Sequence, residues 1–376
     1  MTGSSVVTTL GHHLPDVWSR LHHGDSDVRH AGHIEDFDPT QHLSLERRSL
    51  RRMDRFAQLA MVAAQKAFDQ AGSPLQFHAA NRCGTIIGSC FGGASTIETQ
   101  HTRLRERGPE RVSAFLIPSL MINSASGNIA VHWSLKGPSC GLSATCASGL
   151  HAIGTSFRMI QSGAANVMVC GGAEAPLCET VIAGLTAMGW LSSDDAADEE
   201  SIAPAEGAGL LVLEDFESAS RRGANILAEI IGFAMTSDAA DIVMPSKAGA
   251  ARAIAGALRD GNIAKERVGY INAHGTGTAA NDKTECAAVA DVFGPHADAL
   301  MISSTKSMHG HLIGGTGAVE LLACIMALTD GIIAPTIGYQ EQDPECALDV
   351  VPNEAREAAV DVVMSNAFAF GGLNAV

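Results

Sequence analysis

Residues 143–175 read "SATCASGLHAIGTSFRMIQSGAANVMVCGGAEA" and carry two apolar patterns in succession. Residues 146–163 have apolar side chains at helical spacing and a first turn of small residues, which predicts a closely packed helix. Residues 165–175 form a short apolar run that ends near glycines, which predicts a buried strand. A buried strand that directly follows a helix is typical of α/β architecture.

The same alternation extends over the rest of the chain. Strands are predicted at residues 83–90 and 207–216, and an amphipathic helix at residues 53–72 ends at a glycine. The theme of strand, glycine loop and helix returns at residues 251–263, 268–278, 299–307, 315–331 and 358–372. These patterns predict an α/β fold with largely parallel, buried sheets. Two similar parts indicate an internal duplication, with one half over residues 1–220 and the other over residues 221–376.

Composition excludes several classes of protein. The 376 residues are 46% hydrophobic, which is ordinary for a globular protein with an ample core. The net charge of −16 argues against a general nucleic-acid surface. No apolar run of about 20 residues predicts a membrane span, and no basic segment with an apolar stretch predicts secretion. We therefore expect a cytoplasmic protein that binds neither nucleic acid nor membrane.

The nine cysteines are scattered and odd in number. No CxxC pair is present, which argues against a zinc site and more strongly against a disulfide framework. Most of them are expected to be small buried side chains.

Cys146 differs from the others by its position. A lone cysteine is more often structural than reactive. Cys146, however, lies where a helix is predicted to begin, and there the free N–H groups and the macrodipole favour a thiolate. A thiolate is a nucleophile, and the same N–H groups can hold an oxyanion.

Two histidines stand where a nucleophilic cysteine would need partners. His274 ends a predicted strand in "NAHGTGT", and His311 follows Lys306 in "STKSMHGHLIGGTG". Loops at the carboxyl ends of strands are where α/β proteins place their chemistry. Together with Cys146 these residues predict a Cys/His/His site. The glycine-rich loop lacks the order of a nucleotide-binding GxxxxGK[ST] motif, so we do not expect it to bind a nucleotide.

One basic segment stands out on an acidic chain. Residues 45–56 contain "ERRSLRRMDRF", and at helical spacing Arg48, Arg51, Arg52 and Arg55 lie close to one face. The segment is either a solvated helix face or a docking patch for an acidic partner.

In this order, the pieces resemble the β-ketoacyl-ACP synthase (ketosynthase) family of the thiolase superfamily, in its elongating branch. The resemblance covers nearly the whole chain, and the two histidines are 37 positions apart, as the family's motifs require. It rests on five collinear segments and on the helical segment 51–68: "GPSCGLSATCASG", "VMVCGGAEA", "NAHGTGTAANDKTE", "STKSMHGHLIGGTGAVE" and "NAFAFGGLNA". It implies a five-layered αβαβα fold made of two duplicated halves, and usually a homodimer.

The resemblance also implies a reaction. Cys146 would take an acyl group from an acyl carrier protein (ACP) as a thioester. His274 and His311 would support decarboxylation of malonyl-ACP and stabilise the enolate that attacks the acyl group. The product would be a 3-oxoacyl-ACP, in fatty-acid or type II polyketide biosynthesis. The enzyme would need no cofactor or metal of its own, because the phosphopantetheine of ACP carries the substrates.

Further roles follow from the same resemblance. Lys306 would act electrostatically and pair with Glu320 on the next helix. The hydroxyls of Thr276 and Thr278 would bind the phosphopantetheine arm. Phe370 would gate the site, with Gly371 beside it, and its N–H would join that of Cys146 in an oxyanion hole. The resemblance favours the docking role for the basic segment, with these carrier-protein contacts: Arg48, Arg51 and Arg52.

Departures from the family pattern leave alternatives open. Segment 191–206 is shorter than usual, His309 stands where the family has threonine, and both ends of the chain are brief. These features favour a specialised ketosynthase, such as one from a type II polyketide or polyene pathway, which could pair with a ketosynthase-like subunit. An acyltransferase that uses acyl-Cys146 without decarboxylation is an alternative, and so is a non-catalytic partner subunit.

Overall fold

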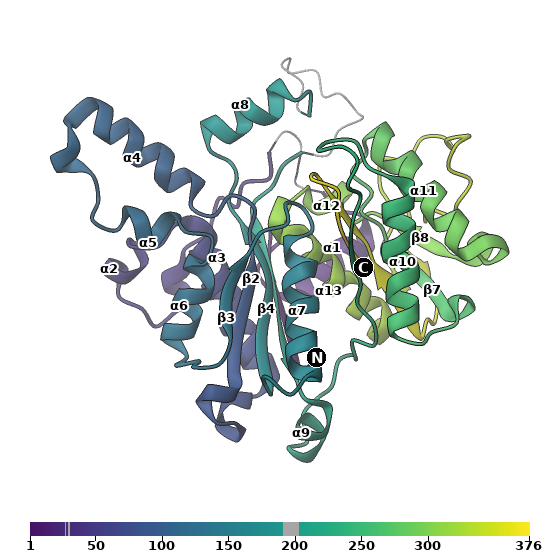
Figure 1. The fold of residues 1–376 in the computed structure, drawn as a ribbon, viewed down its shortest axis with the longest axis horizontal. Coiled ribbons are helices and arrows are strands. Elements are labelled where there is room, and N and C mark those ends of the chain that lie inside the picture. Colours follow the sequence, from purple (N-terminus) through teal and green to yellow (C-terminus); the bar gives the residue numbers. More distant parts are fainter. Residues whose placement is uncertain (27, 29–30, 191–202) are drawn as a thin grey trace.

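The computed structural model describes residues 1–26, 28, 31–190 and 203–376 (Figure 1). Its first sheet has the strand order β1-β5-β4-β2-β3. The central pairs β4–β2 and β2–β3 are parallel, as predicted. The five strands are β1 (Gly3–Val7), β2 (Cys83–Gly88), β3 (Ser139–Leu142), β4 (Val167–Glu174) and β5 (Gly207–Glu214).

The prediction of largely parallel sheets is wrong for one edge of this sheet. Strand β5 runs antiparallel to both β4 and β1. Both faces of β5 are buried, so its sequence is a continuous apolar run, like that of a parallel strand. A continuous apolar run indicates that a strand is buried on both faces, but it does not indicate the direction of the strand.

The second half of the chain forms a parallel sheet with the order β11-β7-β8. A small antiparallel sheet, β12-β13-β6, lies beside it, and β9 pairs with β10. The strands are β6 (Met235–Ser237), β7 (Val268–Asn272), β8 (Met301–Ser303), β9 (Ile332–Ile333), β10 (Arg356–Glu357), β11 (Val362–Ser365), β12 (Ala367–Ala369) and β13 (Leu373–Ala375). The division into halves at residue 220 stays a prediction.

Helices complete five layers (Figure 1). Helices α3 (Arg55–Ala71) and α6 (Ser124–His132) cover the outer face of the first sheet. Helices α7 (Ser148–Gln161) and α13 (Thr316–Asp330) fill the middle layer, and α13 contacts both sheets. Helices α10 (Lys247–Asp260) and α11 (Ala279–Phe293) lie on the far side. The α/β fold with an αβαβα arrangement predicted from the sequence is therefore confirmed.

The remaining helices are short or peripheral: α1 (Leu14–His23), α2 (Arg47–Leu50), α4 (Ala94–Arg107), α5 (Leu116–Leu120), α8 (Glu179–Ala187), α9 (Phe216–Arg221) and α12 (Lys306–His309). Short 3₁₀ turns occur at Pro39–Gln41, Pro74–Phe77, Ala80–Arg82, Pro109–Arg111, Lys265–Arg267, Gly294–Ala299 and Ile313–Gly315.

The middle layer packs closely because glycines line it. A Cβ atom on Gly88 of β2 would lie 2.4 Å from the backbone of Ser148, the first residue of α7. A Cβ atom on Gly172 of β4 would lie 2.4 Å from the carbonyl oxygen of Gly314. Real Cβ atoms do not approach backbone so closely, so both positions need glycine. The small residues predicted in the first turn of α7 therefore allow this helix to pack closely against strand β2.

Segment Ile313–Asp330 alone among the described helices has the length and hydropathy of a membrane span. Here 72% of it is buried inside the protein, where α13 forms part of the middle layer.

The cysteines correct one expectation. Cys286 and Cys346 form a disulfide, although the sequence argued against disulfides. The fold brings together two residues that are 60 positions apart, and neither their spacing nor their neighbours indicate the pairing. Among the free cysteines, Cys90 is half-buried, Cys140 is exposed, and the others are buried as expected: Cys83, Cys146, Cys170, Cys178 and Cys324.

Candidate active site

Cys146 lies in a tight turn between β3 and α7. The Ser148 hydroxyl accepts the N–H of Ala144 (2.8 Å) and donates to the carbonyl of Thr145 (2.6 Å), which fixes the turn. Thr145 adopts a φ of 45°, a left-handed conformation that a β-branched residue rarely takes. This strained residue directs the chain so that the next side chain, Cys146, points into the site.

Helix α7 begins at Ser148, two residues after the start predicted from the sequence. Cys146 therefore precedes the first turn. Burial raises the pKa of its thiol to about 12, while the Lys306 ammonium and the N–H of Cys146 oppose the rise. The sequence predicts that a helix N-terminus favours a thiolate at Cys146. In the free site the effect of burial on the pKa is larger, so the cysteine is a thiol.

His274 follows strand β7 and is 3% exposed. Its Nδ1 atom lies 3.4 Å from Nζ of Lys306, which also donates to the carbonyl of His274 and forms an ion pair with Glu320. An ammonium group can only donate hydrogen bonds, so Nδ1 of His274 is the acceptor and Nε2 carries the proton. The predicted pairing of Lys306 with Glu320 is present, and both side chains are fully buried.

His311 follows the short helix α12 and is fully buried. Its Nδ1 atom accepts the N–H of Ile313 (3.0 Å) and lies 2.8 Å from the Thr316 hydroxyl. The proton of the neutral ring is therefore on Nε2. Within the described part of the chain, this Nε2 atom has no hydrogen-bond partner. It is a buried donor available to a substrate.

The three side chains meet in space. Sγ of Cys146 and one ring nitrogen each of His274 and His311 all lie within 4.8 Å of one another. The two rings are nearly perpendicular, with centroids 5.8 Å apart. Burial, followed by the Lys306 cation, holds the pKa of both imidazoles well below the ordinary value for histidine. Both rings are therefore neutral N–H donors at physiological pH.

These three atoms are also, among the residues that the structure describes, the one group of side chains spaced to hold a metal ion. Thiolate and imidazole suit zinc. The neighbouring Lys306 ammonium would repel a cation. That the enzyme needs no metal or other cofactor stays a prediction.

A cavity of about 200 Å³ opens beside the three side chains. The predicted residues Thr276, Thr278 and Phe370 line it, and the two hydroxyls lie 2.9 Å apart. The side chains that sequence reasoning missed line it as well: Met188, Trp190, Val243, Met244, Pro245, Asn281 and Phe368. The ring of Trp190 lies edge-on to that of His311, with centroids 5.2 Å apart.

The Phe370 segment is tied to the turn that carries Cys146. The Thr145 hydroxyl donates to the carbonyl of Phe370 at 2.9 Å. Gly371, which has a φ of 85°, donates its N–H to the carbonyl of Ile242 at 2.7 Å. The predicted gate is thus anchored to both the turn that carries Cys146 and the 242–245 loop.

The basic segment does not form one helical face. Helix α2 ends at Leu50, and Arg55 lies in α3, where its guanidinium pairs with the buried carboxylate of Glu206. The prediction that Arg55 lies on the same helical face as the other arginines is therefore wrong. Its side chain turns inward to Glu206, which comes from a distant segment of the chain. Arg48 and Arg51 are exposed. Arg52 is half-buried, with its guanidinium 4.2 Å from the ring centroid of Phe115.

The departures noted in the sequence have separate outcomes. His309 is buried beside the site, but its ring nitrogens lie 2.8 Å from the carbonyl of Gly310 and 3.1 Å from the Thr305 hydroxyl. It therefore supports the loop and does not line the cavity. Residues 191–202 of the shortened segment lie outside the described residues. The described end of that segment pairs with the backbone of His311 through Ala203 and Ala205, each at 2.8 Å.

Comparison with known proteins agrees with the geometry. Sequence models of the β-ketoacyl synthase N-terminal and C-terminal domains match residues 1–219 and 227–340. The chain belongs to the β-ketoacyl synthase family. It is thus an enzyme of the acyltransferase class, and it forms 3-oxoacyl products by condensation in fatty-acid or polyketide biosynthesis.

Named relatives cover the full chain of this β-ketoacyl synthase. It is 42% identical to 3-oxoacyl-[acyl-carrier-protein] synthase 2 of Synechocystis, over 100% of this chain and 95% of that protein. It is 38% identical to the enzyme of the same name from Staphylococcus aureus, over 100% and 99% of the two chains. Among solved structures it resembles the ishigamide ketosynthase/chain length factor, with a TM-score of 0.93 and 34% identity over 100% and 96% of the chains.

Proposed function

We propose that Cys146 carries the acyl chain and that His274 and His311 serve the condensation. The observation that supports this most directly is the meeting of one thiol and two neutral imidazole N–H donors within 4.8 Å, in a buried pocket. In the first step, the Cys146 sulfur attacks an acyl-ACP thioester. The phosphopantetheine sulfur leaves and takes up the thiol proton, and Cys146 becomes an acyl thioester.

In the second step, malonyl-ACP loses carbon dioxide, and the electron pair of the broken bond forms an enolate on its thioester. The Nε2–H groups of His274 and His311 stabilise the negative oxygen, because fixed donors in a dry site need no reorganisation. The enolate carbon attacks the acyl-Cys146 carbonyl, and the Cys146 sulfur leaves and regains a proton. The product is a 3-oxoacyl-ACP two carbons longer than the acyl chain.

The decisive experiment supplies the enzyme with acyl-ACP and radiolabelled malonyl-ACP. The expected results are acylation of Cys146, release of labelled carbon dioxide and a lengthened product. In Cys146→Ala, acylation and condensation should both be lost. Acylation without decarboxylation would identify an acyltransferase, and no acylation of the wild type would leave only a non-catalytic subunit.

ACP is the proposed partner. A relative in the family was solved as a "type II PKS acyl-carrier protein in complex with its ketosynthase", and it shares 28% identity with this chain. The exposed guanidinium groups of Arg48 and Arg51 give a basic patch on a chain of net charge −16, and such a patch suits an acidic partner surface. Arg52 contributes less, because it is packed against Phe115.

We further propose that the enzyme is a cytoplasmic dimer. Strand β3 is the outer strand of its sheet, and its first two residues are exposed. An open strand edge is a template for pairing with another chain. Exposed apolar side chains gather on the neighbouring helices α4, α5 and α6, and include Ile97, Ile117 and Val131. The same face could accept a second copy or a related subunit.

A further inference from the structure

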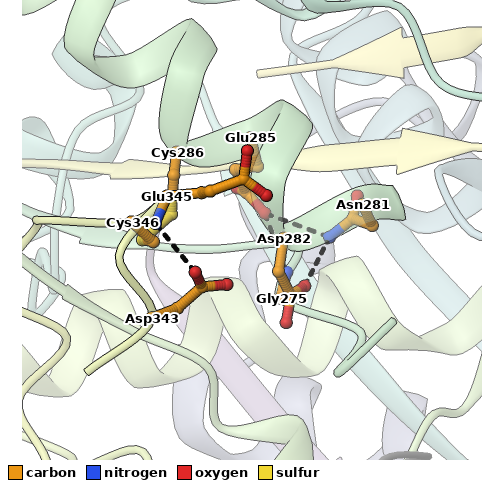
Figure 2. The surroundings of a disulfide bond; sticks show 8 residues. All are labelled: Gly275, Asn281, Asp282, Glu285, Cys286, Asp343, Glu345 and Cys346. Atoms are coloured by element: carbon orange, nitrogen blue, oxygen red, sulfur yellow. Dashed lines mark hydrogen bonds between the residues drawn. A yellow bond between two sulfur atoms is a disulfide. The ribbon is translucent and has the colours of Figure 1, made fainter. Parts of the chain in front are cut away.

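The Cys286–Cys346 disulfide joins helix α11 to an exposed turn at residues 343–346 (Figure 2). The turn is closed by Asp343, whose carboxylate accepts the N–H of Glu345 (2.8 Å) and whose carbonyl accepts the N–H of Cys346 (2.9 Å). Beside the disulfide, Lys283 of α11 forms an ion pair with Glu345 of the turn. Two side-chain links therefore tie the same helix to the same turn.

The linked helix positions a candidate catalytic residue. Glu285, which precedes Cys286, accepts the backbone N–H groups of His274 (2.9 Å) and Gly275 (2.8 Å). It also accepts an amide N–H of Asn366 at 3.0 Å. Figure 2 shows the Glu285 carboxylate close to Gly275, on the helix that carries Cys286. Glu285 of α11 thus holds the loop that presents His274, and the next residue of this helix, Cys286, forms the disulfide.

The disulfide also forms part of the wall of a cavity of about 390 Å³. Cys286 and Cys346 line this cavity together with Ser304, Asp282 and Lys306, the lysine that orients His274. The cavity is separate from the one that opens beside Cys146.

The disulfide is accessible to a reagent in solution. Cys346 is partly exposed, and residues 341–345 and 347 around it are exposed. Most of the free cysteines, in contrast, are buried. In a reducing compartment, accessible disulfides are usually transient or redox-sensing.

We propose that Cys286 and Cys346 are a reversible redox site that controls the condensation half of the reaction. A thiolate of a dithiol reductant attacks the disulfide, and its second thiol resolves the mixed disulfide. Cys286 and Cys346 gain two electrons and two protons as thiols, and the reductant becomes a disulfide. This inference rests on the function proposed above.

Reduction should act on His274 and spare Cys146. Once the crosslink is open, the second of these two side-chain links, the solvent-exposed Lys283–Glu345 ion pair, remains, and exposed pairs contribute little. Glu285 then fixes the His274 loop less firmly. If the His274 N–H donor is displaced by about an ångström, it stabilises the enolate much less well. Cys146 and its turn belong to the other half of the chain, so acylation should continue.

The experiment compares the oxidised enzyme with the enzyme reduced by dithiothreitol, in non-denaturing buffer. Alkylation after denaturation should label seven cysteines before reduction and nine after it. Acylation of Cys146 by acyl-ACP should proceed equally in both states. Decarboxylation of malonyl-ACP should fall by about tenfold on reduction and recover when oxidised dithiothreitol restores the disulfide.

Two variants act as controls. Cys286→Ser/Cys346→Ser should show the lower decarboxylation rate with or without dithiothreitol. Lys283→Ala removes the neighbouring ion pair and should respond to dithiothreitol like the wild type. Circular dichroism of the reduced wild type checks that it stays folded.

Several outcomes would overturn the proposal: seven labelled cysteines that never become nine, equal decarboxylation in both states, or equal loss of acylation and decarboxylation. The last would mark the disulfide as a general stabiliser. A wild type that is not acylated in either state would instead refute the proposed function, and the redox effect with it.

Discussion

Hydrogen bonds to Nδ1 set the protonation of the two imidazoles at the candidate site. Lys306 occupies Nδ1 of His274, and the N–H of Ile313 occupies Nδ1 of His311. Both rings are left with Nε2–H, and burial keeps them neutral. Because the pKa of each ring is lowered, a fall in pH through the usual titration range of histidine does not charge them. Their ability to donate is therefore constant in the physiological range.

The reactivity of Cys146 should, in contrast, depend strongly on pH. Its pKa is raised to about 12, so the thiolate fraction grows with every step in pH below that value. The rate of alkylation of Cys146 by iodoacetamide should rise about tenfold per pH unit between about pH 7 and pH 10, without a plateau. Mass spectrometry of the Cys146 peptide measures the rate. A plateau near neutral pH would mean that the free site holds a thiolate.

Lys306 is expected to matter for stability as well as for chemistry. Lys306→Met leaves the Glu320 carboxylate buried without its cation, which should cost about 3–5 kcal/mol of unfolding free energy. Lys306→Met/Glu320→Gln removes both charges and should recover a large part of that loss, although decarboxylation stays impaired. Urea unfolding followed by circular dichroism measures both variants. If the single and the double variant were equally stable, the unpaired charge of Glu320 would not be the cause of the lost stability.

At the scale of elements, the start of α7 depends on glycines in the strands beneath it. Gly88→Ala places a methyl group 2.4 Å from the Ser148 backbone, so the first turn must move. We expect a loss of about 1–3 kcal/mol in unfolding free energy and slower acylation of Cys146. The matched control is Gly184→Ala in α8, where a Cβ atom meets nothing within 4 Å. A Gly88→Ala enzyme with unchanged acylation would contradict the close-packing argument.

Local sequence patterns predict the helices, the strands and the three side chains of the candidate site. They do not predict the residues that line the cavity around these side chains. The strand-loop positions of His274 and His311 and the helix start near Cys146 are local features, so they were predictable. Trp190 and the loop at residues 243–245 reach the cavity through long-range packing, which no local pattern encodes. The same limit explains the unexpected direction of β5 and the inward turn of Arg55.

At the scale of the whole molecule, the open edge of β3 predicts the state of assembly. Val131 of α6 is 82% exposed, although it is apolar. In a dimer formed through this face, Val131→Glu should bury a charge and shift the enzyme toward the monomer. Sedimentation should give about twice 39.0 kDa for the wild type and a lower average mass for the variant.

The matched control for this prediction is Phe216→Glu in α9. Phe216 is also exposed, at 56%, but helix α9, which begins at Phe216, lies apart from α6 (Figure 1). This variant should sediment like the wild type. A wild-type enzyme with the mass of a single chain would contradict the dimer.

The partition of the site between the two sheets has a consequence for synthesis of the protein. Cys146 lies in the part of the chain that leaves the ribosome first, and its neighbours His274, Lys306 and His311 follow more than a hundred residues later. A nascent chain therefore carries the proposed nucleophile without the histidines proposed to assist it. The chain can carry out the proposed condensation only after α13 has packed on the first sheet. Truncated products of translation should therefore be unable to consume malonyl thioesters.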